Sequence, residues 1–550
     1  MNLKGLRKRF WIAGGCIIAL VIVIFSYVKS EAKPEPVTNQ NGFTNISNKY
    51  RNKEDVFKKE YQEQVHKNIE QMKEKYNYSI QHPLLIINPY STITNGVYVY
   101  FKSDDSVSVE YTMSADGYAD YTQKIYSGET SGVSTEHEST LIGAIHGKQN
   151  TLTLTSYDKE GNVVETSSFS FKAPATVGKA DQHPTEVKNG ESTKGLTNGL
   201  FCTSSQGNEF VGMYDNDGVL RGELLAISYP ARRIIEKDGY LYMCVSTQKM
   251  IRMDRTGYID KVYQIDSKYK LHHDYIFGKK NDILILGTRV DYDSASDLIL
   301  RLDIDTGKIV QVIDFRNLLP NYYKMTKISN NADQNDWLHF NSLVWTDDGK
   351  LLASSRETST VICLKDIYKD KVSISYMIGS DQFWKGTGYE KLVYKKQGDF
   401  SAQGGQHGLI YSRDDSLKKG QYFLTMFNNN NTFATTRTDY DWFKDSNYSG
   451  TGASTINPVE FSYYYRYLVD TNKKTFSLVE SIPIAYSPYV SNVQNFDNGN
   501  RLIESGANAM VEEVDEKGVL IRSIKFYCTA EYTMLYRVFK YDFNGFWFEK

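Results

Sequence analysis

The sequence predicts an all-β protein in which a small β-sandwich precedes a six-bladed β-propeller, with a transmembrane or signal helix and an amphipathic helix in front. Three observations support this fold class. The chain of 550 residues has 42 Tyr and 26 Phe but only 11 Pro, a composition that favours strands. Short apolar runs separated by turn residues fill most of the chain. A unit of strand, Asp-containing turn and strand recurs toward the C-terminus.

The N-terminal segment, residues 1–32, is expected to be a membrane anchor or an export signal. An uncharged apolar run from Trp11 to Val28 follows the basic residues Lys4, Arg7, Lys8 and Arg9. This run is just long enough to cross a bilayer as a helix, with the basic cluster in the cytoplasm. We therefore expect a single-pass protein of the cell membrane whose main domain lies outside the cytoplasm. The alternative is a cleaved signal and a secreted or periplasmic protein, because Ser30 and Ala32 form a small-x-small site.

Residues 33–80 are expected to form a linker and an amphipathic helix. The stretch from Asn48 to Asn77 lacks Gly and Pro, and it sets apolar residues at helical spacing, namely Val56, Tyr61, Val65, Ile69 and Met72. The helix is expected to be a stalk or a clamp on the domain that follows. A homodimer contact is the alternative.

Two further segments separate this helix from the propeller. Residues 81–176 contain short alternating runs such as Val97 to Phe101 and Val163 to Phe171, which predict the β-sandwich. Residues 177–196 are polar and lack apolar periodicity, and they are expected to be a linker.

Residues 197–550 contain the recurring unit, and they are expected to form the propeller. Most copies lie about 40 to 60 residues apart, close to the length of a propeller blade. An insertion from about Asn428 to Thr455 interrupts the pattern and is expected to be a loop over one mouth of the channel. The six turns are Asp215 to Gly218, Asp254 to Gly257, Asp303 to Gly307, Asp366 to Lys371, Asp470 to Lys473 and Asp515 to Gly518.

Charge and cysteine content exclude some functions. The formal net charge of -2, with both signs spread along the chain, provides no basic stripe for nucleic acid. The five cysteines include no CxxC pair, so neither a zinc knuckle nor a dense disulfide framework is indicated. Beyond Cys16 we expect four isolated buried thiols, although one or two disulfides would be compatible with an oxidising compartment.

The histidines beyond the linker gather in three short segments, and these are the candidate site. Each segment starts a strand that runs into a turn and an apolar return strand. When the turns are superposed, His273, Asn341 and His407 fall in register, with His339 two residues earlier on the same strand face. Alternation places His272 on the opposite face. Arg356 closes the strand that pairs with the His339 strand. It is expected either to face the same channel or to form a salt bridge at the rim.

This set of side chains suits an anion with several oxygens. Three histidines could hold zinc, but Asp274, the nearby acid, follows His273 directly and should face away on an extended strand. The remaining groups are cationic and rich in hydrogen-bond donors, so sulfate and phosphate esters both qualify. No Gly-rich phosphate loop precedes a Lys, which argues against a nucleotide-dependent sulfotransferase.

The same segments resemble the signature of the bacterial arylsulfate sulfotransferases, over the chain from about His82 to the end. The matching stretches are Trp337-Leu338-His339-Phe340-Asn341-Ser342, Ser354-Ser355-Arg356, Gly405-Gln406-His407, His272-His273-Asp274, Tyr486-Ser487-Pro488 and Asn88-Pro89. The resemblance implies an exported six-bladed propeller behind a small β domain. It also implies an enzyme without a cofactor that moves sulfuryl groups between small phenols and aryl sulfates.

By this resemblance His407 is the nucleophile that becomes transiently sulfated. His273 or His272, His339, Asn341 and Arg356 are the groups around the sulfate, and Ser491 is the candidate contact from the C-terminal blade. Two departures stand out. Gly408 follows the nucleophile where a hydroxyl residue is expected, and Glu357 follows Arg356 where a His is common.

Two alternatives to this function remain open at the level of sequence. The first is a membrane-tethered propeller that binds a ligand or a surface partner without catalysis. The second is a hydrolase or metalloenzyme on the same fold. Three aligned polar positions favour the enzyme, because a binding module has no need of an aligned nucleophile.

Overall fold

The computed structural model describes residues 42–44, 52–129, 131–178, 183–205, 210–227, 233–329, 332–432, 434–448, 460–527 and 534–550. The predicted anchor, with Cys16, lies outside the described residues, and so does Cys528. Within the described part, no helix is both long and apolar enough to cross a membrane. Cys202, Cys244 and Cys363 are buried and free, as expected for isolated thiols.

The protein is mostly β, as predicted, and its N-terminal part is one six-stranded sheet. Strand β2 is long and belongs to both halves of this sheet: residues 97–102 pair with β1 and β4, whereas residues 108–114 pair with β3 and β5. The strands expected to form a sandwich are therefore joined through β2 into one hydrogen-bonded sheet. Its strands are β1 (Leu84–Ile87), β2 (Val97–Ser114), β3 (Tyr121–Lys124), β4 (Ser134–Leu141), β5 (Gln149–Tyr157) and β6 (Val163–Lys172).

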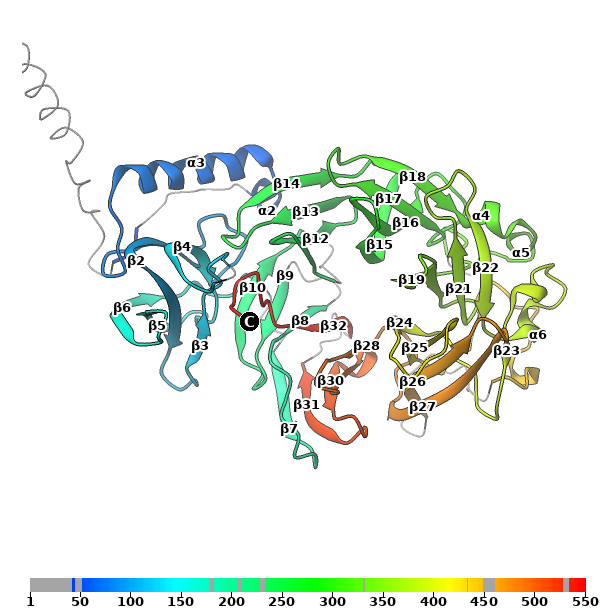
Figure 1. Ribbon diagram of the computed structural model, residues 1–550. Coiled ribbons are helices and arrows are strands. Elements are labelled where there is room, and N and C mark those ends of the chain that lie inside the picture. Colours follow the sequence, from blue (N-terminus) through cyan, green and yellow to red (C-terminus); the bar gives the residue numbers. More distant parts are fainter. Residues whose placement is uncertain are drawn as a thin grey trace, which may run out of the picture.

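Six smaller sheets follow in the described residues, arranged in succession round a centre (Figure 1). The first sheet is, in order of pairing, β10 (Leu220–Leu225), β9 (Phe210–Tyr214), β8 (Leu200–Ser205) and β32 (Leu535–Tyr541). The second is β11 (Ile235–Lys237), β12 (Tyr240–Ser246), β13 (Lys249–Met253) and β14 (Ile259–Gln264). The third is β15 (Tyr269–Phe277), β16 (Asp282–Arg289), β17 (Leu298–Asp303) and β18 (Ile309–Asp314).

The fourth sheet is β19 (Phe340–Trp345), β20 (Leu351–Ser355), β21 (Thr360–Lys365) and β22 (Ser373–Ile378). The fifth is β24 (His407–Ser412), β25 (Gln421–Asn428), β26 (Phe461–Asp470), β27 (Thr475–Ala485) and β23 (Lys395–Lys396). The sixth is β28 (Asn492–Asn495), β29 (Arg501–Ser505), β30 (Met510–Val514), β31 (Leu520–Phe526) and β7 (Pro184–Asn189).

The recurring Asp turn occurs once in each of these six sheets. In four sheets it joins the outer-edge strand to its neighbour, for example β9 to β10. In the fifth and sixth sheets, where β23 and β7 lie outermost, it joins the two strands before that edge, for example β30 to β31. The carboxylate holds the turn by accepting backbone N–H groups: Asp215 Oδ1 lies 2.9 Å from the nitrogen of Val219, and Asp515 Oδ1 lies 2.9 Å from that of Val519. The predicted period of the repeat is therefore confirmed, and its origin is an Asp side chain that caps a tight turn.

Strands from the start and the end of the region of smaller sheets complete two of these sheets. The C-terminal β32 pairs with β8 in the first sheet, and β7 pairs with β31 in the sixth. The interpretation of residues 177–196 as an irregular linker was therefore wrong in part, because β7 lies within them. Its pattern hides the strand, since Glu186 and Lys188 are exposed on an outer edge and β7 shows no apolar alternation.

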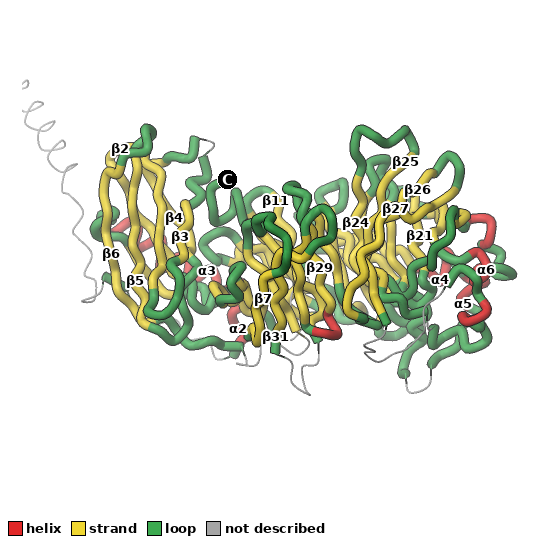
Figure 2. Tube along the Cα trace, turned by 90° about the horizontal axis from the view of Figure 1, so that it is seen from below, coloured by secondary structure: helices red, strands yellow, loops and turns green. Residues whose placement is uncertain are grey.

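The sheets pack face to face, and this explains their continuous apolar strands. In β16, residues Ile283–Leu286 are all fully buried, because a neighbouring sheet covers each face. Each such side chain contributes roughly 1.5–3 kcal/mol through burial. Short helices lie at the far end of the molecule from the six-stranded sheet (Figure 2). They are α4 (Phe315–Leu318), α5 (Pro320–Tyr323) and α6 (Asp381–Trp384). Three further short helices are η1 (Glu390–Leu392), η2 (Trp442–Lys444) and η3 (Gly506–Asn508), the last between β29 and β30.

The expected amphipathic helix is present as α2 (Lys53–Val56) and α3 (Lys59–Lys75), and it acts as a clamp. Val65 and Ile69 are buried in the core beneath it. The amide of Gln62 donates to the carbonyl of Tyr90 and accepts from the nitrogen of Ile259, at 3.1 and 3.2 Å. The helix therefore ties the six-stranded sheet to the second of the smaller sheets.

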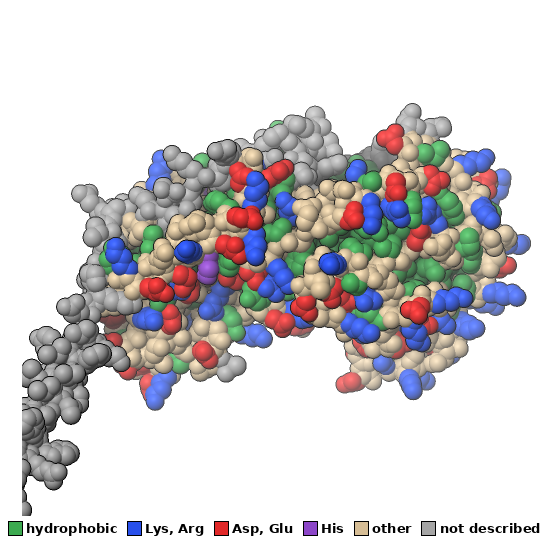
Figure 3. All heavy atoms as spheres, turned by 90° about the horizontal axis from the view of Figure 1, so that it is seen from above, with side chains coloured by type: hydrophobic (Ala, Val, Ile, Leu, Met, Phe, Trp, Pro, Cys, Tyr) green, Lys and Arg blue, Asp and Glu red, His purple; other side chains and the backbone are tan. Residues whose placement is uncertain are grey.

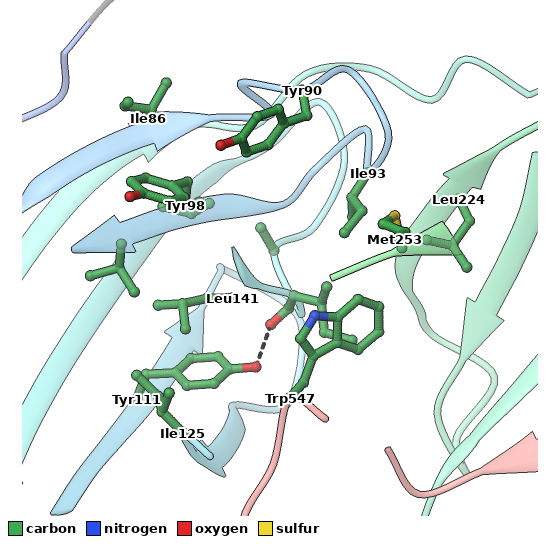
Figure 4. Packing of buried hydrophobic residues seen from close by; sticks show 14 of the residues in the cluster. Ile86, Tyr90, Ile93, Tyr98, Tyr111, Ile125, Leu141, Leu224, Met253 and Trp547 are labelled. Atoms are coloured by element: carbon green, nitrogen blue, oxygen red, sulfur yellow. Dashed lines mark hydrogen bonds between the residues drawn. The ribbon is translucent and has the colours of Figure 1, made fainter. Parts of the chain in front are cut away.

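One hydrophobic core extends from the six-stranded sheet into the first two smaller sheets. Leu224 of β10, Met253 of β13 and Trp547 near the C-terminus pack with Ile93 and Leu141 (Figure 4). The hydroxyl of Tyr111 in this core donates to the carbonyl of Ile142 at 2.9 Å. On the face shown in Figure 3, Lys and Arg are interspersed with Asp and Glu, in keeping with the small net charge.

Candidate functional site

The three histidine segments belong to edge strands of consecutive sheets: His272 and His273 lie within β15, His339 directly precedes β19, and His407 begins β24. These strands pack side by side, β15 on β19 and β19 on β24. Each has an irregular register at its polar segment, between Leu271 and Tyr275, between Phe340 and Ser342, and between His407 and Ile410. Bulges of this kind change the direction of side chains at strand ends. The predicted convergence of the three segments is therefore present in the fold.

His407 is buried, and its hydrogen bonds define which ring nitrogen carries the proton. Nδ1 lies 2.7 Å from Oδ1 of Asn429 and 3.0 Å from the carbonyl oxygen of Gly405, and only 2% of the residue is exposed. A carbonyl oxygen can only accept, so Nδ1 must be the protonated nitrogen. The lone pair of the neutral ring is then on Nε2. Asn429 is in turn held by the carbonyls of Ser487 and Val490, at 2.7 and 3.1 Å.

The pKa of His407 lies well below its usual value. Burial is the main cause, because it penalises the charged imidazolium. The hydrogen bond with Asn429 acts in the opposite direction, whereas the positive charges of Arg537 and Arg356 lower the pKa further. His407 is therefore a neutral imidazole at physiological pH.

His272 and His273 contact each other, which corrects the prediction that they face opposite sides. Their Nδ1 atoms are 2.8 Å apart. Strict alternation fails here because His273 has φ +47°, a left-handed conformation inside the bulge. The ring of His273 also lies against those of His339 and Tyr536, with centroids 4.8 and 5.5 Å apart. The structure thus brings His272 as well as His273 to the site.

His339 has an acidic partner that the sequence did not reveal. Its Nδ1 is hydrogen-bonded to the carboxylate of Asp336, and its Nε2 lies 3.4 Å from Nη1 of Arg356. Burial would raise the pKa of Asp336, but the charge and hydrogen bond of His339 and the charge of Arg356 hold that pKa below its usual value. The expectation of a site without a carboxylate was therefore wrong. Asp336 was missed because it precedes the strand in an irregular segment.

Asn341 connects two of the strands at the site. It is fully buried, and its amide nitrogen donates to the carbonyl of Gln406 at 2.8 Å. The backbone carbonyl of Asn341 accepts a hydrogen bond from the guanidinium of Arg537. Asn341 thus fixes the residue before His407, and it brings an arginine from the C-terminal strand β32 to the same place.

Ser491 lies beside the site with its hydroxyl already engaged. Its Oγ accepts from the backbone nitrogen of Gly506 at 2.9 Å and lies 2.9 Å from Oγ of Ser487. The backbone nitrogen of Ser491 donates to the carbonyl of Tyr536, whose ring faces His273. The segment around Ser491 therefore supports the site, because Ser487 and Val490 also hold Asn429.

Asp274, which alternation predicts to face away from the histidines, is fully buried. Oδ2 accepts from the nitrogen of Leu343 at 2.8 Å, and Oδ1 lies 3.3 Å from both Arg233 and Arg537. The bulge at His273 changes the orientation that alternation predicted. Asn429 and Arg537 were missed as well, because neither lies in a recurring segment and both reach the site only through the packing of sheets.

The two departures from the family pattern have local explanations. Gly408 has φ +64°, and a Cβ there would lie 3.1 Å from Cα of Asn492, so a side chain at this position would be strained. Glu357 is buried, and its Oε1 accepts from the hydroxyl of Thr435 and the nitrogen of Thr436 at 2.7 and 3.0 Å. Both threonines belong to the insertion after β25, so Glu357 anchors that insertion next to Arg356.

A metal-binding cluster of His, Cys, Asp and Glu is not found among the described residues. The site contains the neutral imidazole of His407 with its lone pair on Nε2, the Asp336–His339 pair, and the guanidinium groups of Arg356 and Arg537. Such an arrangement can stabilise negative charge on the oxygens of a group that the imidazole attacks.

Comparisons with known proteins fall into two kinds. No curated protein matches the chain. Among solved structures, a protein of unknown function from Bacteroides caccae is 8% identical, with 62% of this chain and 98% of that chain covered and a TM-score of 0.36. BamB from Moraxella catarrhalis is 11% identical, covering 63% and 92%, with a TM-score of 0.30. Virginiamycin B lyase from Staphylococcus aureus is 12% identical, covering 62% and 99%, with a TM-score of 0.29.

The family assignment rests on sequence rather than on these structural likenesses. The family model described as Arylsulfotransferase (ASST) matches residues 185–536, which is well over half of the chain. The match begins in β7 and ends in β32, and it includes all three histidine segments. The chain therefore belongs to the arylsulfotransferase (ASST) family.

Proposed function

We propose that this protein transfers a sulfuryl group from an aryl sulfate ester to a phenol, without a nucleotide cofactor, through a sulfated His407. One observation carries this proposal: Nδ1 of His407 is held as a donor by Asn429 and Gly405, which leaves the lone pair on Nε2. Since burial also keeps the ring neutral, the nucleophile is ready at physiological pH.

The reaction divides into two half-reactions of the ping-pong type. In the first, the lone pair of His407 Nε2 forms a bond to sulfur while the bond from sulfur to the aryl oxygen breaks, and that electron pair leaves with the phenolate. In the second, the oxygen of the acceptor phenol attacks sulfur, and the electron pair of the N–S bond returns to Nε2. A covalent intermediate replaces one difficult displacement by two easier ones.

The neighbouring groups supply charge stabilisation and a proton. Arg356 opposes the negative charge that spreads over the peripheral sulfuryl oxygens in the transition state. The carboxylate of Asp336 holds Nδ1 of His339 and so leaves its Nε2 to exchange a proton with the phenol oxygen. Asn341 and the His272–His273 pair complete the donors around the sulfate.

We further propose that the six smaller sheets are the blades of a six-bladed propeller and that residues 1–32 anchor the chain in the membrane, with the enzyme outside the cytoplasm. The pairs β32 with β8 and β7 with β31 support the propeller, because a ring of sheets closes when strands from the start and the end of the repeating region join. Small phenols and aryl sulfates are the expected partners, and nucleic acid is not.

The test mixes the purified chain with 4-nitrophenyl sulfate and a phenol and follows nitrophenolate release. We expect release that depends on the acceptor and is lost in His407→Ala, because the proposed nucleophile is then missing. His82→Ala, which changes an exposed histidine far from the site, should behave as the wild type. Without acceptor, mass spectrometry of the peptide with His407 should detect a sulfated histidine. Full turnover in His407→Ala would refute the assignment of the nucleophile.

A further inference from the structure

Arg537 is a buried cation that contacts Asn341 of the site. The reaction proposed above gives it no role. It lies on β32, and only 1% of the residue is exposed. Nη2 donates to the carbonyl of Asn341, and Nη1 lies 3.3 Å from Oδ1 of Asp274. Nε donates to no acceptor among the described residues. A guanidinium is almost always satisfied when it is buried, so the unused donor requires an explanation.

The charges around Arg537 do not cancel. Asp274 is fully buried, and it is shared between Arg537 and Arg233, at 3.3 Å from each. One carboxylate cannot neutralise two guanidinium groups, so one positive charge remains. A buried charge without a counter-ion is costly, and the structure therefore has a place for an anion.

A second buried acid near Arg537, Glu504, is a weak counter-ion for the guanidinium. Glu504 is fully buried, and among the described residues no side chain donates a hydrogen bond to its carboxyl oxygens. Burial raises the pKa of Glu504 well above its usual value, and the charge of Arg537 offsets this only in part. Burial thus favours the neutral form of Glu504, which makes this acid a weak counter-ion for Arg537.

The position of Arg537 relative to His407 follows from two contacts. Arg537 holds the carbonyl of Asn341, and the amide of Asn341 holds the carbonyl of Gln406, the residue before His407. The positive charge of Arg537 also affects His407 more strongly than that of Arg356 does. Both guanidinium groups, those of Arg537 and Arg356, therefore lie close enough to His407 for their charge to lower its pKa.

We propose that Arg537, oriented by Asp274, is a second guanidinium of the sulfate site and binds a peripheral oxygen of the sulfuryl group. The proposal rests on the proposed function. A sulfate ester is an anion before it reacts, and further charge develops on its peripheral oxygens as the sulfuryl group is transferred. Two guanidinium groups from different sheets, Arg356 and Arg537, would hold two such oxygens. Asp274 acts only through Arg537 and is a positioning residue.

The experiment compares Arg537→Met and Arg537→Lys with the wild type in turnover of 4-nitrophenyl sulfate and in the affinity for inorganic sulfate. In Arg537→Met we expect kcat/KM to fall about 10²- to 10³-fold and sulfate affinity to fall with it, whereas Arg537→Lys keeps the charge and recovers part of both. Arg221→Met is the matched control, since Arg221 is a buried arginine of the same sheet, paired with Asp215 at 2.7 Å. It should leave both quantities unchanged.

The pH profile separates a ligand role from a structural one. Loss of the positive charge in Arg537→Met should move the acid limb of kcat/KM to higher pH, because that charge lowers the pKa of His407. Arg537→Lys should leave the limb where it is. Unchanged kcat/KM, sulfate affinity and pH profile in Arg537→Met would overturn the proposal while leaving the proposed function intact.

Two further outcomes separate a failure of the anion site at Arg537 from a failure of the proposed sulfuryl transfer. If the wild type does not turn over aryl sulfates but binds sulfate through Arg537, the anion site stands and the proposed function fails. If Arg537→Met does not fold, Arg537→Lys decides, since full activity together with full sulfate affinity in a variant that lacks the planar fork would argue against direct binding.

Discussion

At the scale of single residues, the chemistry depends on the protonation state of His407. Both neighbours of Nδ1 are acceptors, so the tautomer is defined by geometry and not by sequence. The histidine motif identifies the residue, but Asn429, which sets the tautomer, comes from the insertion after β25. A motif search could not find it, because an Asn in an Asn-rich loop carries no distinguishing pattern.

The depressed pKa of His407 predicts activity in mild acid. The nucleophile must be neutral, and a pKa below the ordinary value of about 6.5 keeps it neutral at lower pH. We therefore expect kcat/KM to stay level as the pH falls through 6.5 and to decline only well below it. In Asn429→Asp, a carboxylate beside Nδ1 stabilises the imidazolium, so the acid limb should move to higher pH.

Measurement of kcat/KM between about pH 4 and pH 8 tests this prediction. Asn498→Asp, which changes an exposed asparagine of the sixth sheet, is the control and should show the wild-type profile. An acid limb near the ordinary histidine value in the wild type would contradict the description of His407 as a buried neutral ring.

At the scale of elements, the insertion after β25 is part of the site rather than a passive loop. The sequence predicts a loop over one mouth of the channel, and the structure adds how it is attached: Asn429 binds His407 at one end, and Thr435 and Thr436 bind Glu357 further along. Glu357 in turn lies 4.0 Å from Arg356. The residue that departs from the family pattern therefore joins the insertion to a residue of the sulfate site.

We predict that Glu357→Ala loosens this insertion and lowers kcat/KM. A carboxylate that accepts several hydrogen bonds is lost, and each bond to a charged group contributes about 1.5–3 kcal/mol. Amide hydrogen exchange should become faster in residues 434–448, and kcat/KM should fall roughly tenfold, which corresponds to about 1.4 kcal/mol. Glu516→Ala, at an exposed turn, should change neither. Unchanged exchange in residues 434–448 would show that Glu357 does not hold the insertion.

At the scale of the whole molecule, the small N-terminal sheet and the sheets behind it share one core. Leu224 and Met253 from the smaller sheets pack against residues of the six-stranded sheet, and Trp547 near the C-terminus lies between them (Figure 4). The domain boundaries expected from sequence, at residues 81–176 and 197–550, stay a prediction about chain segments. The shared core implies that they unfold together.

Calorimetry should therefore detect one unfolding transition for the whole chain. Leu224→Ala, which leaves a cavity in the shared core, should lower the free energy of unfolding by about 2–5 kcal/mol and shift that single transition to lower temperature. Val310→Ala, at a half-exposed position of β18, should have little effect. Two separate transitions, of which only one responds to Leu224→Ala, would show that the two parts unfold independently.

The sequence by itself determined the β class, the sixfold Asp turn, the amphipathic helix and the histidine segments with their family. These features are local: a capped turn, an apolar period and a motif are complete within a few residues. The tertiary structure alone decided that His272 joins the site, that Asp336 and Asn429 orient the histidines, and that Arg537 meets Asn341 from 196 positions away along the chain. Left-handed backbone at His273 breaks strand alternation. The contact between Arg537 of β32 and Asn341 of β19 depends on the pairing of β32 with β8. No local sequence pattern encodes that pairing, because the two strands are far apart along the chain.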